Sequence, residues 1–253
     1  MSAAKYYEIN RDGVNIRCKG YFGAGETIRN VVITGHGFGG HKDNKAAEHY
    51  AEYVLKKHKD AAVITFNWPC HGDDVRKKLR LADCGTYLDF VVKDAAERFS
   101  GAALYGYATS FGGYLFLKYI HDCGSPFQKT ALRCPAINMY DVLTRTIMKN
   151  DELDRLRKGK EVPVGFDRKV MVGSAFLEEL KTADIRAYDY LDFAENILIL
   201  HGTKDEVVPF EDSRTFAENN IIEFIPVENA DHRFQNPKHM ETAIKAIQTF
   251  FAW

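Results

Sequence analysis

A short segment around a serine, residues 108–113 (ATSFGG), follows an apolar run over residues 102–107 (AALYGY). Where a strand turns sharply into a helix, the residues two before and two after the apex must be small, because a larger side chain would strike the neighbouring backbone. The alanine and the first glycine of the segment meet this requirement around Ser110. The apolar stretch at residues 114–120 indicates a buried helix whose positive N-terminal end faces the serine. The pattern predicts a strand, a tight turn with Ser110 at its apex and a helix, although a serine before two glycines also occurs in ordinary loops.

Two more polar residues follow predicted strands later in the chain. The apolar run at residues 196–202 precedes Asp205, and the run at residues 221–227 precedes His232. An open α/β sheet places its ligand-handling loops after strands of this kind. A serine hydroxyl needs an imidazole as base, and the imidazole needs an acceptor that fixes its tautomer. The order Ser110, Asp205, His232 therefore predicts a catalytic triad. Taken singly, Asp205 also fits a turn aspartate and His232 a surface or helix-capping histidine.

A glycine-rich loop, residues 36–40 (HGFGG), follows a predicted strand at residues 31–35. Acyl transfer passes through an oxyanion that needs two preorganised N–H donors, and such a loop can supply one of them. We expect Phe38 N–H and Phe111 N–H, the residue after the serine, to form this oxyanion hole. The alternative is a phosphate-binding loop, but the segment lacks both the Gly-Lys-Ser/Thr ending and the spacing of a dinucleotide motif.

Several of these segments together resemble the signature loops of the α/β-hydrolase superfamily. They are residues 36–40, 67–72 (NWPCHG), 108–113, 201–209 (HGTKDEVVP) and 230–234 (ADHRF). Within the superfamily, the His-Gly-Phe opening, the small size and the short insertion resemble intracellular bacterial carboxylesterases of the cinnamoyl or feruloyl esterase type. The resemblance implies Ser110 as nucleophile, His232 as general base and acid, and Asp205 as the residue that orients it. Relatives often carry an aspartate where this chain has Asn67, so no catalytic role is expected there.

Strand-like and helix-like segments alternate along the chain. This alternation predicts an α/β fold, and the resemblance specifies an α/β-hydrolase fold, with a mostly parallel central sheet and helices on both faces. The 253 residues suffice for a sizeable core and are expected to form one domain, residues 1–253. The expected strands lie at residues 6–8 and 14–18, which form an antiparallel opening, and at 31–34, 62–67 and 129–134, with helices at 46–57 and 85–99.

The connection between residues 134 and 196 is longer than a helix crossover requires. We interpret residues 136–185 as a small cap, because the segment is too poor in apolar residues to form a core of its own. Residues 162–173 suggest a short hairpin within it. Phe166 and Met171 of the cap, together with Trp68, are the expected substrate contacts. The cap's apolar side chains equally fit packing on the main domain, and the sequence does not separate the two.

Composition excludes several classes of function. A formal net charge of −1 argues against an electrostatic nucleic-acid surface. The five cysteines are odd in number and lack a Cys-x-x-Cys pair, which indicates reduced thiols and a cytoplasmic protein. No apolar signal core or membrane-spanning stretch is present in the sequence, so no membrane association is expected. His36 and His71 lie beside the predicted site without metal-ligand spacing, so neither a metal nor another cofactor is expected. His201 is interpreted as a loop residue that bonds the backbone.

The sequence therefore predicts a serine hydrolase that cleaves carboxylic esters through an acyl-enzyme on Ser110. Its partner is expected to be a small-molecule ester, either a hydroxycinnamate or a short-chain acyl ester. Thioesterase, lipase-like or peptidase activity would use the same triad, and a non-catalytic binding protein of the same fold is an alternative from another class. Dehalogenases and epoxide hydrolases carry an aspartate at the position of Ser110 and are disfavoured. The sequence gives no expectation for the oligomeric state.

Overall fold

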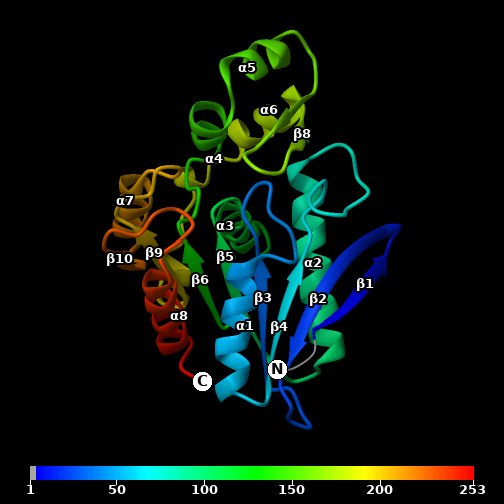
Figure 1. The fold of residues 1–253 in the computed structure, drawn as a ribbon, viewed down its shortest axis with the longest axis vertical. Coiled ribbons are helices and arrows are strands. Elements are labelled where there is room, and N and C mark those ends of the chain that lie inside the picture. Colours follow the sequence, from blue (N-terminus) through cyan, green and yellow to red (C-terminus); the bar gives the residue numbers. More distant parts are fainter. Residues whose placement is uncertain (1–3) are drawn as a thin grey trace.

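The structure is a computed structural model, and it describes residues 4–253. Within these residues, eight strands form one sheet in the order β1-β2-β4-β3-β5-β6-β9-β10 (Figure 1). The strands are Lys5–Arg11 (β1), Val14–Phe22 (β2), Asn30–Gly35 (β3), Ala61–Phe66 (β4), Ala103–Thr109 (β5), Lys129–Arg133 (β6), Ile197–Gly202 (β9) and Glu223–Val227 (β10). The first two strands pair antiparallel, as predicted, and the pairs from β4 to β10 are parallel.

Helices cover both faces of this sheet, as the fold class predicted. They are Lys45–Lys57 (α1), Leu81–Arg98 (α2), Phe111–Cys123 (α3), Phe210–Asn220 (α7) and Pro237–Phe251 (α8). Successive side chains of a strand point to opposite faces, so Val32 packs with α1 and α8 whereas Ile33 packs with α2, α3 and α7. None of the helices described in residues 4–253 is both long and apolar enough to cross a lipid bilayer.

The parallel register brings the ends of four neighbouring strands to about the same level. Gly35 of β3 lies opposite Ala108 of β5, and Thr109 lies opposite Arg133 of β6. Arg133 in turn lies opposite Leu200 of β9. The loops that leave these strand ends therefore meet at one edge of the sheet, below the part of the chain at the top of Figure 1.

That upper part is the insertion between β6 and β9, which includes the predicted cap region. Its elements are α4 (Met139–Asp141), a π-helical turn at Val142–Ile147, α5 (Asn150–Arg157), β7 (Val162–Val164), β8 (Val170–Val172), α6 (Ser174–Thr182) and two 3₁₀ turns at Ile185–Ala187 and Leu191–Asn196. β7 and β8 pair antiparallel with Val162 opposite Val172, which confirms the predicted hairpin. Leu143, Val164 and Phe176 are buried in the same apolar cluster as α2 and α3. The insertion thus packs on the main core and does not enclose a separate one.

Candidate active site

Ser110 occupies a strained turn between β5 and α3, with φ 53° and ψ −120°. A positive φ is unfavourable for a residue with a Cβ, so neighbouring contacts must hold it. The Ser110 N–H donates to Arg133 O at 3.1 Å, and Ser110 O accepts from Ala136 N–H at 3.1 Å. A Cβ at Gly112 would lie 2.5 Å from Gly35 O, so only glycine fits two residues after the serine. The strand, tight turn and helix predicted from this segment are all present.

His232 and Asp205 are brought together by the neighbouring parallel strands β10 and β9. His232 Nδ1 lies 2.7 Å from Asp205 Oδ2, and the aspartate side chain has no exposed surface. A Cβ at Gly202 would lie 2.3 Å from Ala230 O, so the glycine allows the two loops to approach this closely. The hydrogen bonds that His232 makes within residues 4–253 include none to Ser110. The structure therefore forms the predicted aspartate–histidine pair and places the serine at the end of a strand in the same sheet.

The Asp205 carboxylate receives hydrogen bonds on both oxygens. Oδ1 accepts from Val207 N–H and from Val208 N–H, each at 2.8 Å. Oδ2 faces His232 Nδ1 and also His201 Nε2, which lies 3.1 Å away. Burial by itself raises the pKa of this carboxyl, but the hydrogen bonds from the two histidines outweigh it and hold the pKa well below its usual range. The carboxylate is therefore ionised at neutral pH and fixed in orientation.

His201 makes one contact that the sequence indicated and one that it did not. Its Nε2 lies 3.2 Å from Val208 O, which agrees with a backbone-bonding residue, but the same atom also faces Asp205. In the sequence, the only signal of this second contact was the four-residue spacing between His201 and Asp205. Together with Cys134, these two residues place potential metal-ligating atoms within 4.8 Å of one another. The Asp205 oxygens already receive four hydrogen bonds, so the carboxylate of this cluster is engaged with its own protein partners.

The glycine-rich loop passes directly beside the serine. A Cβ at Gly37 would lie 3.2 Å from Ser110 Cβ, and Gly40 N–H donates to Gly37 O at 2.9 Å, which closes a tight turn around Phe38. Phe111 is the first residue of α3, where backbone N–H groups have no acceptor within the helix. The rings of Phe38 and Phe111 pack edge to face with centroids 5.6 Å apart. Both predicted oxyanion donors therefore belong to segments that adjoin Ser110, and their aim at a substrate oxygen stays a prediction.

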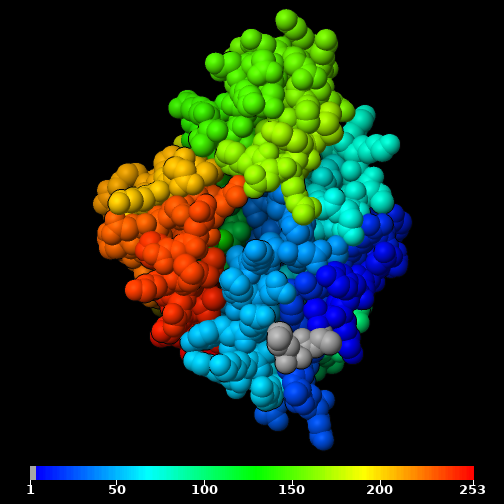
Figure 2. Space-filling view, viewed as in Figure 1, coloured from blue at the N-terminus to red at the C-terminus, as the bar shows by residue number. Residues whose placement is uncertain are grey.

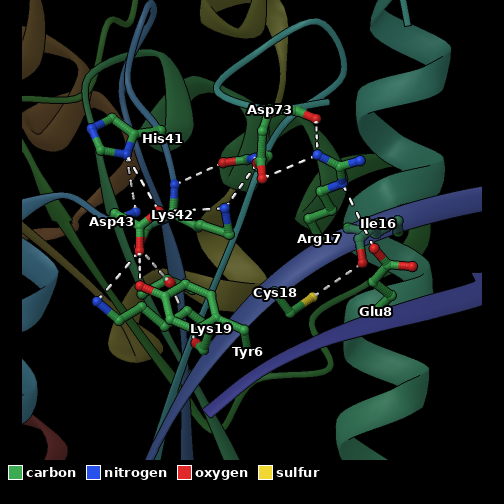
Figure 3. A network of polar contacts seen from close by, with 12 residues as sticks. Tyr6, Glu8, Ile16, Arg17, Cys18, Lys19, His41, Lys42, Asp43 and Asp73 are labelled. Atoms are coloured by element: carbon green, nitrogen blue, oxygen red, sulfur yellow. Dashed lines mark hydrogen bonds and ion pairs between the residues drawn. The ribbon is translucent and has the colours of Figure 1, made fainter. Parts of the chain in front are cut away.

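A network of polar side chains anchors the far end of this loop (Figure 3). The Lys42 ammonium donates to Asp73 Oδ1 at 2.8 Å and lies 3.3 Å from Asp43 Oδ2, while Lys42 N–H donates to Asn67 Oδ1 at 2.8 Å. Arg17 Nη1 lies 3.1 Å from Asp73 Oδ2. Burial by itself raises the pKa of Asp73, but the hydrogen bonds and charges of Lys42 and Arg17 together outweigh it and lower the pKa to about 2. Asn67 thus ties two loops together, and the absence of a catalytic role for it stays a prediction.

Trp68 lies beneath the glycine-rich loop and not in the space above the serine. Its side chain has no exposed surface, its Nε1–H donates to His36 O at 2.9 Å, and its ring packs against Phe66 at 4.5 Å. The predicted substrate contact at Trp68 is therefore corrected, because the indole supports the loop from below. His71 is also buried there, and burial lowers its pKa to about 4. Its ring stacks on Phe111 at 6.0 Å, so a neutral imidazole packs behind the glycine-rich loop.

The tip of the cap hairpin touches both sides of the site. Asp167 Oδ2 lies 3.1 Å from Arg233 Nη1, which belongs to the residue directly after His232. On the opposite side, a Cβ at Gly39 would lie 3.0 Å from Arg168 O, so the hairpin rests on the glycine-rich loop. Figure 2 shows a recess beneath the cap, between the orange surface near the C-terminal end and the blue surface of the first part of the chain. The hairpin therefore bridges this recess.

Phe166 and Met171, the predicted cap contacts, are the exposed apolar residues of this hairpin. Their exposed fractions are 48% and 39%, respectively. The Arg233 guanidinium lies 6.0 Å from the Phe166 ring, so this phenylalanine lies near the histidine loop. Phe176 of the cap is buried and packs edge to face against Phe111 at 6.2 Å. The apolar residues of the cap thus divide between core packing and exposure, and a contact of Phe166 or Met171 with substrate stays a prediction.

Comparison with known proteins identifies the family of the chain and agrees with its fold. The profile of the prolyl oligopeptidase family matches residues 67–253. Est1E from Butyrivibrio proteoclasticus with bound ferulic acid has 19% sequence identity and a TM-score of 0.77, with 97% of each chain covered. A soluble variant of monoglyceride lipase from Saccharomyces cerevisiae has 12% identity and a TM-score of 0.74, covering 100% of this chain and 96% of that one. Mouse alpha/beta hydrolase domain-containing protein 10 has 14% identity and a TM-score of 0.73, with 98% of each chain covered. No curated protein sequence is significantly similar to this chain.

Proposed function

Because the chain belongs to the prolyl oligopeptidase family and has the α/β-hydrolase fold, we propose that it is a serine hydrolase that cleaves carboxylic esters through an acyl-enzyme on Ser110. The observation that carries this proposal is the 2.7 Å contact between His232 Nδ1 and Asp205 Oδ2, made by loops that follow strands of the same sheet. An aspartate at Nδ1 leaves Nε2 of the imidazole free to act as a base. The strained turn presents Ser110 at the same edge of the sheet.

In the proposed mechanism, His232 Nε2 takes the proton of Ser110 as the hydroxyl oxygen attacks the ester carbonyl. The negative charge that develops on the carbonyl oxygen is stabilised by Phe38 N–H and Phe111 N–H. The alcohol leaves with the proton held by His232, and a water deprotonated by the same residue then hydrolyses the acyl-enzyme. Asp205 stays ionised throughout and stabilises the imidazolium. Catalytic hydrogen bonds are often long before substrate binds, so the serine–histidine bond is expected to form in the complex.

The cap hairpin favours a compact ester over an extended peptide. Because Asp167 contacts Arg233 on one side and Arg168 O approaches Gly39 on the other, a peptide chain through the recess would have to displace the hairpin. A small ester with one flat acyl group needs no such displacement. The family name favours peptidase activity as the second candidate, and the two are separated by substrate.

An aromatic acyl group, such as a hydroxycinnamate, suits the side chains around the serine. Phe38 is partly exposed beside Ser110, the buried Phe111 ring supports it in edge-to-face contact, and Phe166 is half exposed on the hairpin above. Flat aromatic ligands are held well by apolar walls of this kind. The fold similarity to Est1E, whose structure holds ferulic acid, is in keeping with this choice of substrate.

The purified protein tests the proposal directly. We expect hydrolysis of p-nitrophenyl acyl esters and methyl hydroxycinnamates, and labelling by a fluorophosphonate probe that is lost in Ser110→Ala. Acyl thioesters and peptide p-nitroanilides should be cleaved more slowly than the matching esters. Cleavage of peptide anilides without ester cleavage would make the protein a peptidase. Absence of labelling would favour a non-catalytic binding protein.

The proposed site of action is the cytoplasm. All five cysteines are free in the structure, and such thiols persist in reducing compartments. Cell fractionation with an antibody against the protein tests this, and recovery with secreted proteins would contradict it.

A further inference from the structure

Arg133, the last residue of β6, is a buried cation without a carboxylate partner. Its exposed fraction is 6%, and no acidic group within residues 4–253 forms an ion pair with it. Its Nε is buried and makes no hydrogen bond. The hydroxyl of Tyr107, on the neighbouring strand, is likewise buried without a hydrogen-bond partner. Burying an unpaired charge is unfavourable, so a residue of this kind is expected to serve a purpose other than stability.

Besides its pairing with the neighbouring strands, Arg133 contacts the loops that carry the proposed serine and histidine. Its Nη1–H donates to Arg233 O at 3.1 Å, and its guanidinium lies over the ring of Phe234 at 4.9 Å. These are the two residues that directly follow His232. At its backbone, the Arg133 carbonyl accepts from Ser110 N–H at 3.1 Å. One residue therefore contacts both the turn that carries the serine and the loop that carries the histidine.

The histidine loop is a tight turn that depends on such support. Phe234 N–H donates to Asp231 O at 3.2 Å, and Phe234 has a φ of 52°, so His232 and Arg233 occupy the corner of a strained turn. A carbonyl at such a corner points away from the turn's own hydrogen bond. Without Arg133, the Arg233 carbonyl would lose its side-chain donor and the Phe234 ring its cationic neighbour.

We propose that Arg133 is a positioning residue that fixes the His232 loop relative to Ser110. The proposal rests on the proposed function, because it concerns the geometry of proton transfer between these two residues. A misplacement of about 1 Å can cost on the order of a hundredfold in rate, so a modest loosening of this loop should be visible in kcat. Substrate binding, by contrast, does not involve Arg133 directly and should change little.

The test compares Arg133→Met and Arg133→Lys with a matched control. Methionine keeps the apolar stem but removes the donor, whereas lysine can still reach the Arg233 carbonyl but lacks the flat group that stacks on Phe234. Val63→Ala is the control, because Val63 is buried in the apolar cluster that includes Phe234 and lies on β4, away from both loops. Each variant is measured for kcat and KM on an ester, for urea midpoint, and for amide hydrogen exchange over residues 230–236.

We expect Arg133→Met to lower kcat about a hundredfold with KM within about twofold, and Arg133→Lys to recover about tenfold of that loss. Exchange over residues 230–236 should rise in Arg133→Met and not in Val63→Ala at a comparable urea midpoint. Unchanged kcat and local exchange in a folded Arg133→Met would overturn the proposal, and so would equal losses in the control. If Arg133→Met does not fold, Arg133→Lys with wild-type kcat and exchange would overturn it. The exchange result does not depend on the substrate, so it distinguishes failure here from failure of the proposed esterase activity.

Discussion

His201 and Asp205 are in contact inside the protein, with Nε2 of the histidine 3.1 Å from Oδ2 of the aspartate. The same oxygen faces His232 Nδ1 at 2.7 Å, so two imidazoles share it. His201 Nε2 also lies 3.2 Å from the carbonyl of Val208. Since both neighbours of this nitrogen are acceptors, Nε2 must carry a proton. His201 therefore fixes the Asp205 carboxylate in place, and the carboxylate in turn orients the His232 ring.

Replacing His201 should affect turnover without any contact with substrate. His201→Leu removes the donor to Asp205, whereas a glutamine at this position can present an amide N–H in nearly the same place. We expect His201→Leu to lower kcat by at least about tenfold, the usual range for a hydrogen bond to a charged group, and His201→Gln to retain more of it. Steady-state kinetics on a p-nitrophenyl ester measures both. Equal kcat in the leucine variant and the wild type would show that the contact is not needed to orient Asp205.

Substitution of the serine tests the proposed nucleophile. Ser110→Ala should lower kcat by about a million-fold, because removal of the nucleophile abolishes the covalent route and the other triad members cannot replace it. The strained backbone at this turn accommodates alanine as well as serine, so the urea midpoint should stay near that of the wild type. Turnover within tenfold of the wild type would exclude Ser110 from the chemistry.

The aspartate can be distinguished from a second carboxylate close to it in sequence. Asp205→Asn keeps the shape of the side chain but offers an N–H where His232 needs an acceptor, and should lower kcat on the order of ten-thousand-fold. Asp231→Asn is the control, because Asp231 Oδ1 accepts from Gln235 N–H and has no hydrogen bond to the His232 ring. A larger loss in Asp231→Asn than in Asp205→Asn would show that the roles are reversed.

The structural features that the sequence predicted correctly are those that a local pattern of residues determines. The turn at Ser110 and the hairpin over residues 162–173 follow from small residues and short apolar runs, and both are present. The helix expected at residues 85–99 instead begins at Leu81. Its first turn is held by Glu179 of the cap, whose Oε2 accepts from Leu81 N–H at 2.9 Å. Because Glu179 is distant from Leu81 in the chain, the residues around Leu81 carry no local signal that the helix begins there.

The same limit explains the site residues that sequence patterns assigned wrongly or missed. Trp68 lies next to a predicted site loop in the sequence, but the direction of its side chain is set by the strand before it and by the His36 carbonyl that it bonds. Arg133 reaches the histidine loop only because β6 ends beside it in the folded sheet. The residues proposed to react were thus recognisable by type and order, whereas those that support them are defined by contacts across the fold.

Acid should destabilise the protein through buried histidines. Folded His71 keeps a pKa of about 4, whereas its ordinary value in an unfolded chain is 6.5. Between these values the unfolded state binds a proton that the folded state does not, so the free energy of unfolding falls as pH drops from about 6.5 to about 4, by up to about 3 kcal/mol. His71→Asn removes this titration and should flatten the dependence, measured by urea unfolding at several pH values. His36 shifts in the same direction, so some slope should remain. An identical slope in His71→Asn would contradict the assignment.

Substrate choice is predicted to depend on the exposed residues of the cap hairpin. Val162, Val164, Val170 and Val172 are buried, so removing the whole hairpin would disturb the core as well as the recess. Phe166→Ser and Met171→Ser change only exposed side chains. Each apolar contact with a bulky aryl group is worth roughly 1–3 kcal/mol, so the double variant should lower kcat/KM for methyl hydroxycinnamates about tenfold or more and leave p-nitrophenyl acetate nearly unchanged. Asp167→Asn is the control, because it weakens the ion pair with Arg233 but keeps both apolar side chains. An equal loss on acetate and aryl esters would show that the hairpin supports the scaffold and does not select the acyl group.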